Sequence, residues 1–175
     1  MRTFSAKVRR LAERQAGRVS TAQLTALGVE SVVIARWVGA GYLAPVLPRV
    51  YAVGHRAPSV EADLFAAVLY AGPGAMLSHA TALWWHGLLD HRPWPLQVST
   101  PRRCRSLSGI RVSGRRRCQR IFHKGLPTTR LEQAVLDFAA TAPHERLRYV
   151  LAVADHRKIF DLAALRAVAG SGSAK

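Results

Sequence analysis

Apolar residues in the first third of the chain recur at the spacing of three and four positions that places them on one face of a helix. This spacing predicts helices over residues 5–17, 20–28 and 31–40, each ending at or beside a glycine. Ser5 is expected to cap the first of them, and Ser20 with Gln23 is expected to form a capping box at the start of the second. Two short strand-like runs follow, 42–44 and 50–53, separated by a turn that contains two prolines. Two helices joined by a glycine turn and followed by a hairpin are the plan of a winged helix-turn-helix, which binds DNA.

Beyond the hairpin, helical and strand-like patterns alternate. The elements expected there are helices at 60–71 (capped by Ser59) and 78–88 (capped by Ser78), strands at 96–100, 110–112 and 120–122, and helices that begin near 129 and 147. We therefore expect an α+β protein. A winged helix-turn-helix should occupy residues 1–56, a mixed helix–sheet–helix domain should occupy 57–169, and 170–175 should form a flexible tail rich in glycine and serine.

Positive charge is concentrated in two separate segments of the chain, and this concentration indicates what kind of partner the protein binds. The net charge is +16, with nine Lys/Arg against two acids in residues 1–60 and ten Lys/Arg with no acid in residues 101–130. A polyanion such as duplex DNA rewards this concentration, because each Lys/Arg that meets a phosphate releases a counterion. A protein that only has to stay in solution carries less charge, with both signs interspersed. Nucleic acid is therefore the partner that the charge favours, and a basic protein with no such partner is the alternative.

In the first basic segment, the predicted winged helix-turn-helix gives the charged side chains expected positions on DNA. The helix over 31–40 is expected to enter the major groove, and the hairpin turn to lie against a phosphate or the minor groove. The residues expected to contact DNA are Arg9, Arg10, Arg14, Ser31, Arg36 and Arg49. For Arg36 three roles stay open, namely reading a base edge, clamping a phosphate, and forming a salt bridge with Glu30.

The second basic segment carries more charge but no DNA-binding motif. Its basic residues are expected on loops and on one face of a sheet, with Ile110 directed to the core and Arg111 directed outward. The patch comprises Arg102, Arg103, Arg105, Arg111, Arg115, Arg116, Arg117 and Arg120. Flanking DNA, RNA, an acidic protein surface and solvent alone all remain open. Stacking on single-stranded RNA is disfavoured, because Phe122 is the one aromatic residue nearby.

Candidate chemistry is sparse. His79, His86, Asp90 and His91 could be taken for metal ligands, but the strong zinc pattern of two histidines four apart with a nearby glutamate is missing, so we expect neither metal nor cofactor. The carboxylates do not cluster as a metal-dependent nuclease requires, and no nucleophile elbow or phosphate-binding loop appears, so no enzymatic activity is expected.

The segments that would mark export or membrane insertion are also missing from the pattern. No apolar run approaches the length of a membrane span, and the first residues lead into a charged helical pattern. We therefore expect a cytoplasmic protein without membrane association. Cys104 and Cys118 are then expected to be reduced, with a disulfide between them as the minority interpretation.

An ordered series of short motifs, spread over the chain to about residue 169, resembles AbiEi-type antitoxins of type IV toxin–antitoxin (abortive infection) systems and related actinobacterial regulators. The residues that carry the resemblance are Gly28-Val29, Ile34, Arg36, Val38, Gly41, Leu43, 50–54, 72–75, 77–79, Thr81-Ala82, Gly87-Leu88, Val98, Pro101-Arg102, 109–112, 125–129, Leu131, Ala134, Leu136, Asp137 and Ala139. The chain departs from the family at the wing, where Pro48-Arg49 replaces the usual Arg-Gly, and at Glu30, where the family usually has Ser or Thr.

The resemblance implies two activities. The N-terminal domain would bind promoter DNA and repress the operon, and the C-terminal domain would counteract a nucleotidyltransferase-like toxin. The expected function is therefore a DNA-binding regulator, an antitoxin that represses its own operon. Two alternatives stay open. One is the DNA-binding portion of a larger nuclease-bearing protein, since some relatives end in a nuclease domain. The other is an antitoxin whose basic C-terminal domain binds an acidic toxin or RNA.

Overall fold

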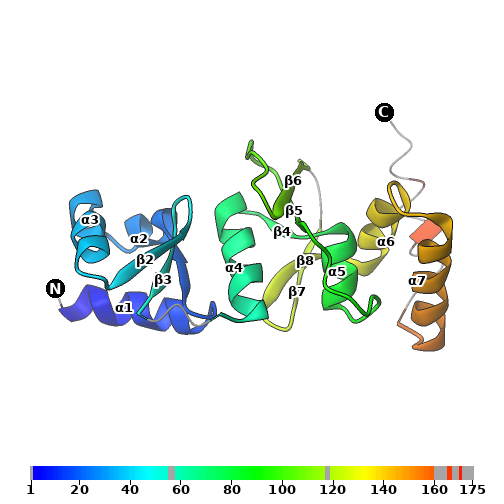
Figure 1. The fold of residues 1–175 in the computed structure, drawn as a ribbon, viewed down its shortest axis with the longest axis horizontal. Coiled ribbons are helices and arrows are strands. Elements are labelled where there is room, and N and C mark those ends of the chain that lie inside the picture. Colours follow the sequence, from blue (N-terminus) through cyan, green and yellow to red (C-terminus); the bar gives the residue numbers. More distant parts are fainter. Residues whose placement is uncertain (1, 55–57, 117–118, 160–164, 167–169, 171–175) are drawn as a thin grey trace. The chain divides into compact units, whose positions relative to one another are not determined.

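The computed structural model describes residues 2–54, 58–116, 119–159, 165–166 and 170. Within these ranges the chain is mixed α and β, with seven helices and two sheets, as Figure 1 shows. It divides into two compact units, Met1–Pro73 and Gly74–Lys175, which we call the first and second units. The tail expected over 170–175 lies outside the described residues apart from Gly170.

The first unit places three helices and a hairpin around one core. Its elements up to the hairpin are α1 (Arg2–Glu13), β1 (Arg18–Ser20), α2 (Thr21–Ala26), α3 (Ser31–Gly39), β2 (Leu43–Leu47) and β3 (Val50–Val53). The three strands form an antiparallel sheet in the order β1-β3-β2. The core is apolar, and Val8, Leu24, Ile34, Trp37 and Leu43 are buried in it.

The helix starts in this unit were predicted with mixed success. The capping box is confirmed, because the Ser20 hydroxyl accepts from the Gln23 amide while the Gln23 side chain accepts from the Ser20 amide. The prediction that Ser5 caps the first helix is wrong. Ser5 lies inside α1, and its hydroxyl is 3.3 Å from that of Tyr42, so it tethers the helix to the chain before β2.

The turn of the hairpin places Arg49 in a backbone conformation that glycine adopts more readily. Leu47 pairs with Val50, so Pro48 and Arg49 form a two-residue turn. Proline has a fixed φ that suits the first of these positions, and Arg49 follows with a φ of +62°, a conformation usually reserved for glycine. Arg49 therefore adopts this turn conformation at a cost in backbone strain.

The boundary between the units lies later than expected. The helix α4 (Val60–Ala71) begins where predicted, and the Ser59 hydroxyl accepts from the Ala62 amide. It packs on the three strands of the first sheet and buries Leu64 and Val68, so it belongs to the first unit. The structure therefore divides the chain at Pro73 and not at residue 56. The apolar face of α4 needs the sheet of the first unit as its cover.

The second unit is built on a five-stranded mixed sheet. Its elements are β4 (Met76–Leu77), α5 (His79–Trp85), β5 (Leu96–Thr100), β6 (Ile110–Gly114), β7 (Arg120–His123), β8 (Leu126–Thr129), α6 (Leu131–Ala139) and α7 (His144–His156). The strand order is β6-β5-β4-β8-β7, which leaves β6 and β7 at opposite edges. The helix after Ser78 ends earlier than predicted, at Trp85, and the Ser78 hydroxyl makes no capping bond. That hydroxyl lies 3.0 Å from Nδ1 of His79.

Candidate functional site

In the first unit, α3 and the hairpin enclose a groove that contains two of the predicted DNA contacts. The groove has a volume of about 750 Å³ and lies between the start of α2, the side of α3 and the β2–β3 turn. Its polar lining consists of Thr21, Ser31, Arg49 and Tyr51, and the Thr21 amide donates to the carbonyl of Arg49 at 2.9 Å. The structure therefore brings together Ser31 and Arg49, which are far apart in sequence.

The other predicted contacts of the first unit are exposed but more dispersed. Arg36 is exposed on α3, and no ion pair joins it to Glu30 in the part of the chain that the structure describes. Arg9 and Arg10 are exposed on α1 and Arg14 is exposed just beyond its end, but none of the three lines the groove. The sequence thus identified accessible cations, and the structure places two of its six candidates around one groove.

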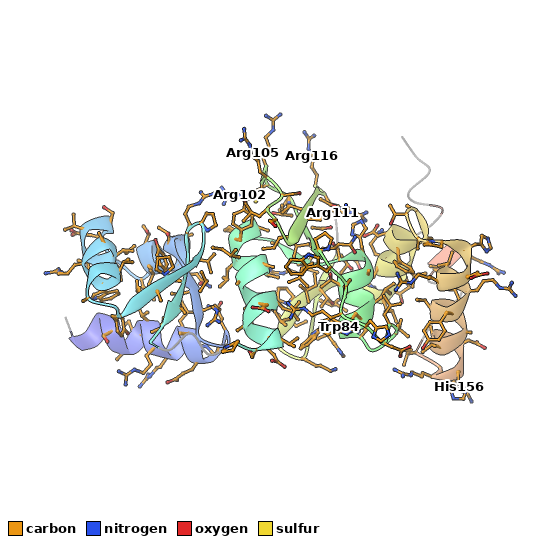
Figure 2. All side chains as sticks on the ribbon, in the orientation of Figure 1. Trp84, Arg102, Arg105, Arg111, Arg116 and His156 are labelled. Carbon is orange, nitrogen blue, oxygen red and sulfur yellow. The ribbon has the colours of Figure 1, made fainter. Side chains whose placement is uncertain are left out.

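In the second unit, strand pairing gathers arginines that belong to two different loops. The strands β5 and β6 run parallel, and Thr100 pairs with Gly114, so the C-terminal ends of both strands lie next to each other. Residues after β5 and residues after β6 therefore start from one place, and Figure 2 shows Arg102, Arg105 and Arg116 on the same side of the unit. We call the exposed set the arginine patch; it consists of Arg102, Arg103, Arg105, Arg111 and Arg116.

Three arginines that we expected in this patch are not placed there. Arg115 is the first residue after β6, but its guanidinium pairs with the buried carboxylate of Asp137 on α6. Arg120 lies on β7, the opposite edge strand from β6, where its guanidinium stacks 5.2 Å from the centre of the Phe122 ring. Arg117 lies outside the described residues. The predicted single patch is therefore wrong for Arg115 and Arg120.

Asp137 is the centre of a buried polar cluster that the sequence analysis missed. Its side chain is 3% exposed, and Oδ1 accepts from Arg115 and, at 2.8 Å, from Nε2 of Gln133. Its other oxygen lies 4.0 Å from Nδ1 of His79. The available signal was an acid within the apolar stripe of a helix, between Ala134 and Phe138, where an unpaired charge is costly.

His79 lies at the edge of this cluster, and its backbone conformation is unusual. It has a φ of +51° at the first position of α5, which is an uncommon conformation for a residue other than glycine. Burial lowers the pKa of His79; Asp137 opposes this effect, and the positive charges of Arg115 and Arg111 lower the pKa further. Near neutral pH the ring is therefore mainly uncharged, and the charge on Asp137 is balanced chiefly by Arg115.

A second polar cluster, which contains two histidines, lies at the other end of α5. His86 stacks on His123 of β7 with ring centroids 4.1 Å apart, and its Nε2 lies 3.2 Å from the hydroxyl of Thr128 on β8. Burial lowers the pKa of His86 to about 4, with smaller contributions from His123 and Lys124. His79 and His86 therefore have different partners, although they lie at the two ends of one short helix, His79 as its first residue and His86 as its C-cap.

We expect the second unit to lose stability in mild acid because of His86. An unfolded chain protonates this histidine near its ordinary pKa of 6.5, whereas the folded state resists protonation down to about pH 4. The contribution of uncharged His86 to the free energy of unfolding is therefore fully present above pH 6.5. It is lost as the pH falls from 6.5 to about 4, by about 2 kcal/mol after allowance for partial solvent access. Thermal unfolding from pH 7 to pH 4 measures this loss.

A matched pair of variants tests that assignment. His86→Gln keeps a group that can bond to Thr128 and removes the titration, so its stability should fall less across the same pH range. His156→Gln alters an exposed histidine at the end of α7 and should leave the acid sensitivity in place. An unchanged pH dependence in the His86 variant would show that other groups cause the loss.

The described ranges lack the residue groupings of a metal site and the helix of a membrane span. They contain no group of three or more His, Cys, Asp or Glu placed to hold a metal ion. Within the same ranges, no helix has the length and apolar character needed to cross a bilayer. Cys104 is half-buried, and Cys118, its partner in the minority disulfide interpretation, lies outside the described residues.

Comparison with known proteins identifies the second unit. The model of the AbiEi antitoxin C-terminal domain matches residues 70–171, which is more than half of the chain and includes both polar clusters and the arginine patch. No curated protein matches the chain. The family match confirms the resemblance seen in the sequence motifs, and it indicates an antitoxin as the functional class. The chain belongs to the AbiEi antitoxin family, whose members act in type IV toxin–antitoxin systems.

Proposed function

We propose that this antitoxin represses its own operon and that its first unit is a winged helix-turn-helix that binds the promoter as duplex DNA. The observation that carries the proposal is the order of elements. A helix, a short strand and two helices precede a hairpin, and the hairpin strand β3 lies between β1 and β2 in the sheet. Ser31 of α3 and Arg49 of the hairpin turn line one groove of this unit. In such a motif the helix before the hairpin enters the major groove.

The exposed face of α3 is the surface that would enter that groove. Ile34 and Trp37 point into the core, which leaves Ser31, Val32 and Arg36 accessible. Ser31 and Arg36 are the hydrogen-bonding side chains on this face, so direct reading by hydrogen bonds is restricted to one or two positions. Phosphate contacts must then supply most of the affinity.

The groove between α3 and the hairpin suits a DNA strand. When α3 occupies the major groove and the hairpin reaches beyond it, one sugar–phosphate strand passes between them. The hydroxyls of Thr21, Ser31 and Tyr51 and the guanidinium of Arg49 line this space. Hydroxyl and guanidinium groups are ordinary donors to phosphate oxygens. Arg49 at the turn is thus a phosphate clamp in this proposal.

Arg49→Gly separates the stability of the turn from its binding to DNA. Glycine adopts the φ of +62° without strain, so the free energy of unfolding should rise by up to about 1 kcal/mol. The same change removes one cation, so promoter binding should weaken and the dependence of affinity on salt should become shallower by roughly one unit of slope. Thermal unfolding and mobility shifts on the upstream operon DNA measure the two effects.

The opposite signs make this a discriminating experiment. A variant that is more stable and binds DNA less tightly supports a direct contact by Arg49, because misfolding cannot explain the loss. Arg148→Gln, which removes an exposed charge from α7 in the second unit, is the control and should not alter promoter binding to the same extent. Equal promoter affinity in Arg49→Gly and the parent chain would count against the proposed mode of binding.

The arginine patch supports a second candidate role, as a contact for a polyanion or for the toxin that the family implies. Its guanidinium groups are exposed and come from two loops and an edge strand. Phe122, the exposed aromatic residue within the same basic segment, lies on β7 at the opposite edge of the sheet. Stacking on single-stranded RNA is therefore disfavoured, and the candidates are the phosphates of duplex DNA and an acidic surface of a nucleotidyltransferase-like toxin.

A further inference from the structure

The exposed face of α3 is unusually apolar for a helix that faces water. Val32 is 71% exposed, and the next exposed positions along the same face are Ala35, Arg36 and Gly39. The core of the first unit takes Ile34 and Trp37 from the other side of the helix. Packing within the unit therefore does not use the β-branched side chain of Val32, which is available to a partner.

Gly39 at the last position of the same helix is also unexplained by its own chain. Its φ is outside the left-handed region, and a Cβ built on it would meet no atom within 4 Å. Glycine is among the poorest helix formers, so its presence has a cost and no internal benefit. A missing side chain on an exposed helix face does permit another body to approach the backbone closely.

We propose that Val32 and Ala35 read thymine methyl groups in the major groove and that Gly39 gives the end of α3 room to approach the DNA. This inference rests on the proposed binding of promoter DNA. Thymine is the one base that presents an apolar group, its C5-methyl, in the major groove, and apolar side chains are the natural contact for it. Sequence selection by this chain then comes mainly from apolar contact and only secondarily from Ser31 and Arg36.

The inference specifies a chemical modification of the DNA as its test. The full chain is first used to select binding sites from a randomised duplex library. Each thymine in the selected motif is then replaced singly by uracil, which pairs identically and lacks only the methyl group. Loss of one buried methyl corresponds to about a fourfold loss of affinity. We expect that loss at one or two thymines and no effect at the others.

Val32→Ala links the effect to one residue. The substitution removes an exposed side chain and introduces a better helix former, so the fold is retained. It should weaken binding to the thymine-containing site about fourfold and should abolish the difference between thymine and uracil at one position. Thr25→Ala, which removes an exposed β-branched residue from α2, is the matched control and should keep that difference.

The outcomes separate this inference from the proposed function. Salt-dependent binding to duplex DNA with no selected motif, or with no sensitivity to uracil at any position, overturns thymine reading and leaves the DNA-binding proposal standing. A thymine effect that persists undiminished in Val32→Ala overturns the role of Val32. Failure to bind any duplex in the library overturns the proposed function itself.

Discussion

Replacing Asp137 with alanine should lower the free energy of unfolding of the second unit by about 3 kcal/mol. The carboxylate is almost completely buried and accepts bonds from Arg115 and Gln133, so its removal leaves two donors without their acceptor. Breaking a buried ion pair from one side costs about 3–5 kcal/mol. The lower value applies because the Arg115 side chain is 29% exposed and its guanidinium can turn toward water.

The measurement has to report on the second unit alone, because the first unit has its own core. Hydrogen exchange of the amides in β5 and α6 provides such a local measure. Asp137→Asn keeps the size of the side chain and a bond with Gln133, so it should lose less than Asp137→Ala. Asp155→Asn changes an exposed acid on α7 and should stay within about 0.5 kcal/mol of the parent chain.

Arg115→Met tests the pair from the other side. It leaves the Asp137 carboxylate buried with Gln133 and a largely neutral His79, so a loss comparable to that of Asp137→Ala is expected. If Asp137→Ala were as stable as the parent chain, the ion pair would contribute nothing to the fold, and Arg115 would have to be considered a member of the arginine patch again.

The elements that were predicted correctly are those whose signal lies entirely within a short stretch of sequence. The capping box at Ser20, the cap at Ser59 and the alternation in 96–100 each depend on residues close together in the chain, and each is found in the structure. The three strands that were missed lack such a signal. β1 and β4 are too short for alternation to appear, and all four residues of β8 are buried, one of them a proline.

The candidate site of the second unit depended on contacts that no local pattern contains. The segment 101–130 has no acid of its own, but the fold supplies Asp137 from α6 and withdraws Arg115 from the surface. The parallel pairing of β5 with β6 gathers the rest of the patch, and the strand order moves Arg120 to the far edge. The sequence therefore identified the charge correctly, whereas the partners of that charge are set by strand order and helix packing.

The affinity of the full chain for duplex DNA should fall by about a thousandfold between 50 and 200 mM salt. Each phosphate neutralised by Lys or Arg contributes about −0.9 to the slope of log K against log salt, so six such contacts give a slope of roughly −5. Mobility shifts on the upstream operon DNA across this salt range measure it. A slope near zero would contradict the DNA-binding proposal, because phosphate contacts supply most of the proposed affinity and such contacts weaken as salt rises.

The same slope can determine the partner of the arginine patch. In a variant with Arg102, Arg103 and Arg116 replaced by glutamine, we expect a slope less steep by up to about 2.7 units, because these exposed arginines follow two paired strands that end together and can meet the phosphates of one polyanion. Arg146→Gln and Arg148→Gln on α7 form the control for a mere change in net charge. An unchanged slope together with lost neutralisation of the toxin would instead assign the patch to an acidic protein surface, since DNA binding would then depend on the first unit alone.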